Sequence, residues 1–351
     1  MRTVIGTMTG TSMDGIDAVA VSIEGHGHSL IAKYLNISTV PIDDLQQQLR
    51  DLASESRSEI ELNTAAYAIG ERTAIAIEQL KLAKIDLIAL HGQTIFHEPP
   101  ASIQLIDPMP IVKQFGCEVL TDPRAADLRL GGQGAPITPL ADWIMFRQQN
   151  KSVAVVNLGG FCNITILPAN GQPHEIQGFD LCCCNLLLDA IARDRLHTPF
   201  DPLGKTASSG VVTETLFVKL LNKLQEQHAQ HRSLGSSDDL GCWILEQGDA
   251  VQTEDLLATA TSAIGSFIRN TVDAFDSVFI AGGGVHNTAL VREIGEKAQK
   301  TDSTGVPTQA REAMAMAILG ALATDGVSIT LPHITGRQET TELVGWTQAN
   351  P

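Results

Sequence analysis

Three glycine-containing segments of the sequence, each placed after an apolar run, have the residue types that bind phosphate groups. They are residues 9–15, 158–163 and 282–287. Glycine lets backbone amides approach an anion closely, and successive amides bind phosphate without a lysine. The first segment adds hydroxyl donors, and its Asp14 has the carboxylate chemistry to hold Mg²⁺ through water. A tight turn is the simpler interpretation of any one segment, whereas three together favour nucleotide binding.

Known phosphate motifs and the overall charge limit what kind of site this is. The GxxxxGK[ST] spacing of a Walker loop is missing, and no GxGxxG stands between a strand and a helix. The chain carries 24 Lys and Arg against 40 Asp and Glu, a formal net charge of −16. Such a charge argues against sequence-independent nucleic-acid binding and against adhesion to an anionic membrane. Backbone amides would therefore have to bind any polyanion locally.

Asp180 is the leading candidate for acid–base chemistry, because it ends the strand expected at residues 174–179, just before the helix expected at residues 185–195. A carboxylate in this position acts as a general base or caps the helix, and capping is the commoner role. His91 and His97 flank Gln93 and Thr94 after another apolar run. Structural hydrogen bonding is the simpler interpretation of these histidines.

Two further groups of residues also allow two interpretations each. Arg124, Asp127 and Arg129 either pair with one another or bind a substrate carboxylate through a guanidinium fork. The three consecutive cysteines at 182–184 suit neither tetrahedral zinc nor ordinary disulfides. They are more typical of small buried apolar residues than of a redox centre.

The apolar patterns place these candidate residues at the ends of strands. Strands are expected at residues 3–9, 17–23, 30–39, 85–90, 153–157, 161–167, 174–179 and 277–281. Helices are expected at residues 61–83, 140–149, 185–195, 214–227, 255–274, 288–300 and 312–323. The polar stretch 226–239 is expected to be exposed. Alternation of strands and helices indicates an α/β fold.

The two halves of the chain open in the same way. Residues 3–23 and residues 153–167 each have the pattern of two strands joined by a glycine turn. This similarity indicates an internal duplication of architecture rather than of sequence identity.

The sequence features of exported and membrane proteins are missing. The N-terminus has no apolar region of signal-peptide length, and no run approaches the roughly 18 apolar residues of a membrane span. The six cysteines form no CxxC pair and no disulfide framework. A cytoplasmic protein with reduced thiols is expected, without a nucleic-acid or membrane partner.

Six segments, in their order along the chain, resemble the anhydro-N-acetylmuramic acid kinase family of the sugar-kinase and actin-like superfamily. The segments are Gly10-Thr11-Ser12-Met13-Asp14-Gly15-Ile16-Asp17, His91-Gly92-Gln93-Thr94, Gly131-Gly132-Gln133-Gly134-Ala135-Pro136, Val156-Asn157-Leu158-Gly159-Gly160-Phe161-Cys162-Asn163-Ile164-Thr165, Gly178-Phe179-Asp180 and Ala281-Gly282-Gly283-Gly284-Val285-His286-Asn287. The first and third of these, in that order, are the most specific to the family. Weaker similarities to the family's motifs occur at residues 201–210, 233–235 and 311–313.

The resemblance implies two actin-like (ribonuclease H-like) domains of mixed sheets flanked by helices, with an interdomain cleft. Domain I would comprise residues 1–125, completed by residues 326–351, and domain II would comprise residues 126–325. The resemblance also implies a homodimer.

The activity implied by the resemblance is an ATP- and Mg²⁺-dependent kinase for 1,6-anhydro-N-acetylmuramic acid. Water opens the anhydro bridge and the freed O6 takes the γ-phosphoryl group, giving N-acetylmuramic acid 6-phosphate in cell-wall (peptidoglycan) recycling. Asp180 matches the family's base for that water. The positions expected to bind ATP are Gly10, Thr11, Ser12, Asp14, Asn157, Gly159, Gly160, Gly282, Gly283, Gly284 and Asn287. The positions expected to bind the sugar are His91, Gln93, Thr94, Asp122, Arg124, Asp127, Gly132 and Gln133.

The sequence departs from the family pattern just after Asp180. Family members usually continue with Thr-Gly-Pro-Gly-Asn, whereas this chain continues with Leu181-Cys182-Cys183-Cys184-Asn185. Two alternatives follow: a catalytically impaired sugar or nucleotide sensor of the same fold, and a kinase for a different anhydro-sugar. The retained Asp180, Asp14 and glycine segments favour the kinase, because a sensor would not need the base.

Overall fold

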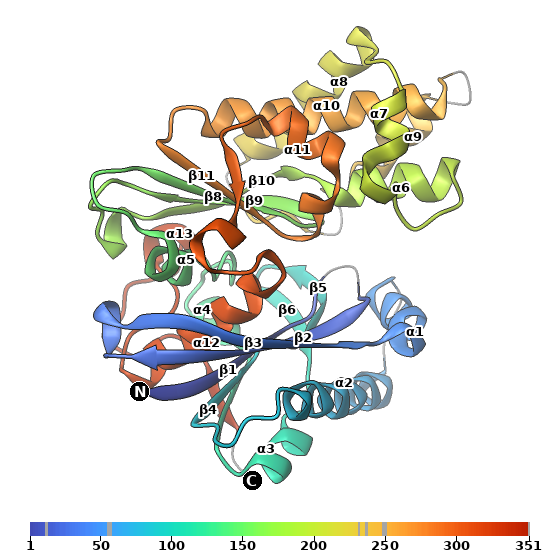
Figure 1. The fold of residues 1–351 in the computed structure, drawn as a ribbon. Helices are drawn as coiled ribbons and strands as arrows, with labels where there is room; N and C mark the ends of the chain where they lie inside the picture. The colour runs from blue at the N-terminus through green and yellow to red at the C-terminus, as the bar shows by residue number, and fades with distance from the viewer. Residues whose placement is uncertain (11–12, 55–57, 231, 236–237, 248–250, 350–351) are drawn as a thin grey trace. The chain divides into compact units, whose positions relative to one another are not determined.

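The computed structural model of the chain describes residues 1–10, 13–54, 58–230, 232–235, 238–247 and 251–349 (Figure 1). The chain divides into two compact units. Unit 1 comprises Met1–Phe146 and Gly305–Pro351, and unit 2 comprises Arg147–Thr304. Unit 1 is therefore discontinuous in sequence, and unit 2 is a single segment inserted into it.

Unit 1 is built on a six-stranded mixed sheet with the strand order β13-β7-β4-β1-β2-β3. The strands are β1 (Arg2–Met8), β2 (Gly15–Glu24), β3 (Ile31–Pro41), β4 (Leu87–Leu90), β7 (Glu118–Thr121) and β13 (Thr347–Ala349). β1 pairs antiparallel with β2 and parallel with β4. A separate hairpin consists of β5 (Gln93–Glu98) and β6 (Ala101–Leu105).

Helices cover both faces of the unit 1 sheet. They are α1 (Asp43–Ser54), α2 (Glu59–Gln79), α3 (Met109–Phe115), α4 (Ala125–Arg129), α5 (Pro139–Phe146), α12 (Arg311–Thr324) and α13 (Pro332–Thr335). α2 begins with a capping box, in which the Ser58 hydroxyl accepts from the Glu61 N–H and the Glu61 carboxylate accepts from the Ser58 N–H. α12 is buried along nearly its whole length and packs on β1, β2 and β4.

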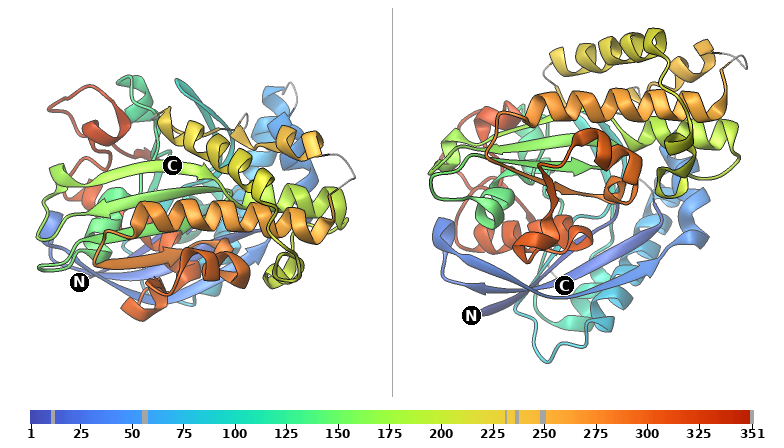
Figure 2. Two further views of the ribbon diagram at one scale, coloured as in Figure 1. Left: turned by 90° about the horizontal axis from the view of Figure 1, so that it is seen from above. Right: turned by 45° about the horizontal axis from the view of Figure 1, so that its top comes forward.

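Unit 2 is built on a five-stranded sheet with the order β10-β9-β8-β11-β12. Its strands are β8 (Val153–Leu158), β9 (Phe161–Leu167), β10 (Gln177–Cys183), β11 (Ser277–Ala281) and β12 (Ala298–Lys300). Its helices are α6 (Asn185–Arg195), α7 (Lys205–Ser209), α8 (Glu214–Ala229), α9 (Gly241–Gln247), α10 (Thr253–Val272) and α11 (Thr288–Ile294). Figure 2 shows α10 lying along one face of this sheet.

The two sheets repeat one topology. In each, the first strand of the unit pairs antiparallel with the second and parallel with the fourth, and the second pairs antiparallel with the third. This is the ribonuclease H-like arrangement, so the expected α/β fold class and the duplication of architecture are confirmed. Throughout the described ranges, no helix has both the length and the apolar character needed to cross a membrane.

The boundaries of the two units differ from those of the expected domains. The expected domains divide after residues 125 and 325, whereas the units divide after Phe146 and Thr304. Residues 126–146 and 305–325 therefore belong to unit 1. The physical reason is that α5 packs on α12, and α12 packs on the central strands of unit 1.

Three local expectations are wrong. The strand expected at residues 174–179 is displaced, because Pro173–Glu175 forms a 3-10 helix and β10 runs on to Cys183, with Asp180 inside the strand. The helix expected at residues 288–300 ends at Ile294, because Gly295 has a φ of +104° that ends the helix, and β12 follows. The polar stretch 226–239, expected to be exposed, contains the buried residues Gln227, Leu234 and Asp238.

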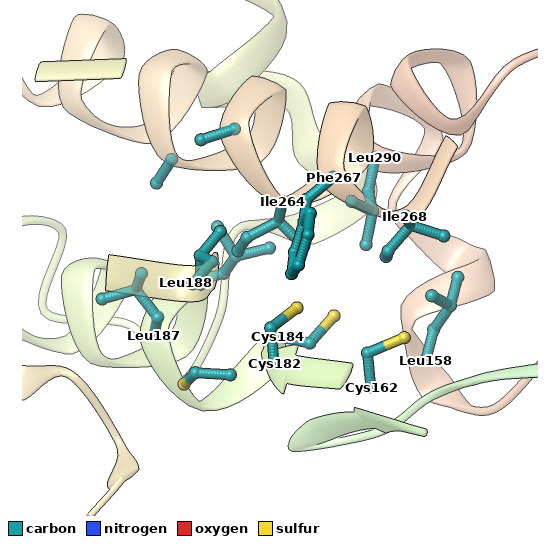
Figure 3. Packing of buried hydrophobic residues seen from close by; sticks show 14 of the residues in the cluster. Leu158, Cys162, Cys182, Cys184, Leu187, Leu188, Ile264, Phe267, Ile268 and Leu290 are labelled. Atoms are coloured by element: carbon teal, nitrogen blue, oxygen red, sulfur yellow. The ribbon is translucent and has the colours of Figure 1, made fainter. Parts of the chain in front are cut away.

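The core of unit 2 lies between its sheet and α10, and it contains most of the cysteines. Figure 3 shows Cys162, Cys182 and Cys184 facing Ile264 and Phe267 of α10. Burial raises the pKa of these thiols, that of Cys184 to about 12, so they are protonated and unreactive at neutral pH. The expectation that the triplet packs as small apolar residues is confirmed.

In unit 1, β1 and α12 lie so close together that only glycine fits between them. A β-carbon on Gly6 of β1 would overlap the carbonyl oxygen of Ala313 and the amide nitrogen of Ala317. A β-carbon on Gly320 of α12 would lie 2.9 Å from the β-carbon of Ala89. The small residues of α12 thus let the helix sit directly on the central strands.

We predict that Gly6→Ala destabilises the protein by at least about 2 kcal/mol, because the added methyl group meets backbone atoms that no rotamer change can move. Urea unfolding measures this as a lower midpoint. Gly241→Ala is the matched control, since a β-carbon there makes only ordinary contacts and lies in a helix. A wild-type midpoint for Gly6→Ala would contradict the close packing of β1 on α12.

Candidate functional site

The two glycine segments of unit 2 meet at one edge of its sheet. β8 and β11 are parallel neighbours, and Asn157 of β8 is in register with Ala281 of β11. Their carboxyl ends therefore lie side by side, with Gly159 and Gly160 after one strand and residues 282–284 after the other. Open α/β sheets bind ligands at such an edge.

Two of the three glycines after β11 are required by the close approach of the loops. A β-carbon on Gly282, whose φ is +84°, would lie 2.8 Å from the Leu158 carbonyl oxygen. One on Gly284 would lie 2.7 Å from the Leu158 β-carbon. Gly283 is exposed, and a β-carbon there would meet no protein atom within 4 Å. Gly283 therefore faces open space, from which a bound molecule can reach its backbone.

Asparagine side chains hold these two loops in place. Asn185 donates from Nδ2 to the Leu158 carbonyl at 2.9 Å and from its backbone N–H to the Gly159 carbonyl at 3.1 Å. Asn157 is buried, and its Oδ1 lies 2.9 Å from the position of a Gly282 β-carbon. Asn157 thus stands between the two glycine loops.

Asn287 has a structural role at the start of α11. Its Oδ1 accepts a hydrogen bond from the Leu290 N–H at 3.0 Å, which caps the helix. A β-carbon on Gly204 would overlap this oxygen, so the segment before α7 packs tightly against the cap. Asn287 therefore fixes where the loop after β11 ends.

Asp180 lies on β10 at a β-bulge. The register between β10 and β9 shifts between Asp180 and Cys182, and the intervening Leu181 is buried in the core. A bulge re-aims neighbouring side chains, and Asp180 is left partly exposed. Its Oδ2 accepts a hydrogen bond from the Leu234 N–H at 2.9 Å. A partly exposed carboxylate held in this way has the chemistry of a general base.

The residues that replace the usual Thr-Gly-Pro-Gly after Asp180 still join β10 to the loop after β8. The N–H groups of Cys184 and Leu186 both donate to the Gly160 carbonyl, at 2.9 and 3.1 Å. The side chains of residues 181–184 are all buried. The departure therefore enlarges the core of unit 2 while the backbone stays bonded to the glycine loop.

In unit 1, the segment after β1 is held by Gln93. The Thr9 hydroxyl donates to Gln93 Oε1 at 2.7 Å, and Gln93 Nε2 donates to the Gly10 carbonyl at 3.3 Å. The same Gly10 carbonyl accepts from the Met13 N–H at 3.1 Å. Gln93 is buried, and both the oxygen and the nitrogen of its side-chain amide form hydrogen bonds to this segment.

The remaining residues of this segment include the candidate metal ligand. Asp14 is exposed, and its carbonyl accepts from the Ile42 N–H at 3.1 Å. Thr11 and Ser12, which are expected to bind ATP, lie outside the described residues. Within the described ranges, no three His, Cys, Asp or Glu side chains gather closely enough to hold a metal ion.

His91 and Arg124 make a buried contact among the residues expected to bind the sugar. His91 Nδ1 lies 2.8 Å from the Gly92 carbonyl oxygen, and Nε2 lies 2.9 Å from Arg124 Nη2. Because a guanidinium only donates, Nε2 is the acceptor and Nδ1 carries the proton. Burial, together with the Arg124 charge, lowers the pKa of His91 to about 3. Arg124 Nη1 also donates to the Gly134 carbonyl at 2.7 Å.

Asp127 is fully buried and holds the GGQGAP segment from the inside. Its Oδ2 accepts from the Gly134 N–H at 2.8 Å, and its Oδ1 accepts from the Thr335 hydroxyl at 2.7 Å. Arg337 Nε lies 3.5 Å from the same Oδ1. A β-carbon on Gly132 would overlap the carboxylate. Asp127 thus ties this segment to the C-terminal part of unit 1.

The expected sugar-binding residues fall into two classes by burial. Those that are partly exposed, and so can contact a ligand, are Thr94, Asp122, Arg124 and Gln133. Those that are buried are His91, Gln93, Asp127 and Gly132. Asp122 also binds the start of α4, since its Oδ1 accepts from the N–H of Ala125, the first residue of the helix, at 3.0 Å.

Sequence reasoning missed an ionisable group at the start of α12. Arg311 is buried, and its Nε donates to Asp142 Oδ1 at 3.0 Å. Burial raises the pKa of the neighbouring Glu312; Arg311 lowers it, and Asp142 and Asp17 raise it further. Carboxyl groups with a shifted pKa occur both at functional sites and in structural ion-pair networks such as the one between Arg311 and Asp142. In the sequence, residues 311–313 show only a weak similarity to the family pattern. Spacing along the chain does not show that α12 packs on α5, which brings Arg311 to Asp142.

Comparison with known proteins identifies relatives along the whole chain. The family model described as anhydro-N-acetylmuramic acid kinase matches residues 2–348. The anhydro-N-acetylmuramic acid kinase of Salinibacter ruber is 32% identical, over an alignment that covers 97% of this chain and 95% of the relative. The protein of the same name from Clostridioides difficile is 29% identical and covers 90% of each chain. The one from Bacillus cereus strain Q1 is 28% identical and covers 97% of each.

The match extends over both units, so it includes the strand-end glycines and Asp180 of unit 2 as well as the residues of unit 1 that are expected to bind the sugar. The relatives from Salinibacter ruber and Bacillus cereus strain Q1 are matched over 95% and 97% of their own lengths. This chain belongs to the anhydro-N-acetylmuramic acid kinase family.

Proposed function

We propose that this chain is an ATP-dependent kinase that opens 1,6-anhydro-N-acetylmuramic acid with water and phosphorylates its O6, in peptidoglycan recycling. The observation that carries the proposal is the arrangement in unit 2. Asp180 lies at a bulge of β10 with an amide donor on its carboxylate, and glycine loops end two parallel strands of the same sheet. A proton acceptor and an amide-lined edge are what this combined hydrolysis and phosphoryl transfer needs.

Asp180 acts as the proton acceptor for the attacking water. As the water oxygen bonds to the anomeric carbon, one proton passes to the Asp180 carboxylate, and the electron pair of the C1–O6 bond stays on O6. O6 then accepts the γ-phosphoryl group, with release of ADP. The products are ADP and the sugar 6-phosphate, and Asp180 returns its proton to solvent before the next turnover.

The phosphates of ATP would be held mainly by backbone amides. We assign Gly10, Gly159 and Gly160 to the phosphates and residues 282–287 to the adenosine side, where the exposed Gly283 backbone leaves room. Mg²⁺ would neutralise phosphate charge, with the exposed Asp14 holding it through water. Local amides offset the unfavourable field of a chain whose net charge is −16.

The sugar would be bound by the residues of unit 1 that are described above as expected to bind it. The partly exposed residues contact it, and the buried ones hold them in place. We assign Arg124 to the acidic group of the sugar, because neutral His91 accepts a hydrogen bond from the guanidinium without cancelling its charge.

The two alternatives have no specific observation in their favour. A sensor without catalysis would not need the base Asp180, whose carboxylate accepts a hydrogen bond from the Leu234 N–H.

A cytoplasmic location and a homodimer are part of the proposal and stay predictions from the family resemblance. Sedimentation equilibrium of the purified chain tests the dimer: particles of two chains are expected, and single chains at all concentrations would contradict it.

We predict that Asp180→Asn lowers kcat by about 10²- to 10⁴-fold, because the amide keeps the shape of the side chain but cannot take the proton. The KM values for ATP and sugar change by less than about threefold. Sugar-dependent ADP release measures both. Asp194→Asn, on the outer face of α6, is the matched control and keeps wild-type kinetics. Near-normal kcat for Asp180→Asn would mean that another group is the base.

We predict that Gly283→Ala raises the KM for ATP by about tenfold, because the added methyl group fills the open space through which the nucleotide reaches the backbone, and one lost hydrogen bond has an effect of that size. The added methyl group meets no protein atom, so the thermal midpoint is unchanged. Gly284→Ala is the contrasting variant, because its methyl group meets Leu158 and lowers the thermal midpoint. If Gly283→Ala binds ATP as the wild type does, the nucleotide does not contact this loop.

We predict that Arg124→Lys raises the KM for the sugar by about tenfold or more, because an ammonium cannot bond His91 and Gly134 together and still face a carboxylate. The KM for ATP is the internal reference and changes little. Arg129→Lys, on the exposed last residue of α4, is the matched control. An equal rise in both KM values would argue against a role in sugar recognition.

A further inference from the structure

Gln227, near the C-terminal end of α8, is a buried polar side chain with no role in the site described above. It is only 6% exposed. Its Oε1 accepts a hydrogen bond from the Cys183 N–H at 3.0 Å, and its Nε2 donates to the Asp238 carbonyl at 2.7 Å. One amide therefore joins the end of β10, just past the bulge at Asp180, to a segment that is distant in sequence.

That segment is the one that contacts Asp180. The Asp238 carboxylate accepts from both terminal nitrogens of Arg232, at 2.8 and 2.6 Å. This fork ties Asp238 to residues 232–235, the turn that contains Leu234. The Leu234 N–H donates to Asp180 Oδ2 at 2.9 Å. The turn is thus fixed at one end by Gln227 and presents its amide to Asp180.

We propose that Gln227 is a positioning residue for Asp180, acting through the Leu234 N–H. This inference rests on the proposed role of Asp180 as the base. Both partners of Gln227 are backbone groups, Cys183 N–H and Asp238 C=O, so the amide fixes β10 and the turn relative to each other. Without it, the turn keeps fewer bonds to β10, so the Leu234 N–H is held less closely against the carboxylate and the carboxylate is less well oriented toward the attacking water.

This arrangement uses the part of the sequence that departs from the family pattern. Cys183 supplies an N–H that a proline at the same position would lack. Its thiol also donates to the Asp239 carbonyl at 3.2 Å, a second bond from β10 to the same segment. The replacement of the usual residues after Asp180 is therefore accompanied by a new connection, for which Gln227 provides the acceptor.

The test compares three substitutions on α8 in the full chain, with ATP and the anhydro-sugar as substrates. Gln227→Met keeps the volume and removes both bonds; we expect kcat to fall about ten- to hundredfold, the effect of a small misplacement, with both KM values within about threefold of wild type. Gln225→Met, on the exposed side of the same helix, leaves kcat unchanged. Gln227→Glu keeps the acceptor for Cys183, and burial favours its protonated form, which donates to Asp238. Gln227→Glu therefore retains more kcat than Gln227→Met.

The outcomes separate this inference from the proposed function. If the wild type turns over and folded Gln227→Met has wild-type kcat, whatever its thermal midpoint, Gln227 is only structural and the inference is overturned. If Gln227→Met does not fold, Asp238→Asn decides, because it weakens the fork that ties Asp238 to Arg232 in the same turn. A lower kcat supports the inference, and an unchanged kcat overturns it. If the wild type itself shows no sugar-dependent turnover, the proposed function fails, and the inference fails with it.

Discussion

The parallel pairing of β8 with β11 is the constraint on which the rest of the unit 2 site depends. Because Asn157 and Ala281 are in register, the glycine loops leave the sheet at one edge and press against each other at Leu158. Their amides are therefore in place before any ligand arrives, so little reorganisation is needed at the moment of reaction. A chain with a net charge of −16 and no Walker lysine needs such fixed donors to bind a polyphosphate.

A second theme is that buried polar residues position partly exposed ones. In unit 1, the buried Asp127 binds the Gly134 backbone, and the buried His91 accepts from the partly exposed Arg124. In unit 2, Gln227 and Asp238 fix the turn whose amide reaches Asp180. Removing one partner of a buried hydrogen bond costs more than the bond itself contributes. The buried residues are therefore the less replaceable part of each site.

The sequence predicts the strands and helices that have strong, uninterrupted patterns. The helix at residues 185–195 and the strand at 277–281 have the expected bounds, because an apolar pattern and a terminal Asn or Gly mark each. The helix expected at 288–300 is too long, because Gly295 stops it and the short β12 has no pattern of its own. The residues after Asp180 show a departure from the family pattern in the sequence, but only the structure shows where their N–H groups go.

The contacts of Gln227 and Glu312 could not be predicted from the chain alone. Gln227 falls in a polar stretch that looks like a solvated helix end, and only the packing of α8 on β10 buries it. Glu312 lies in the first turn of an apolar helix, and only the fold brings Asp142 and Asp17 near it. The most direct test of the central claim is mass spectrometry of the product formed from ATP and 1,6-anhydro-N-acetylmuramic acid by the purified chain. A hydrolytic kinase yields one ADP per sugar and a product heavier by one phosphoryl group and one water; ADP release without that product would contradict the claim.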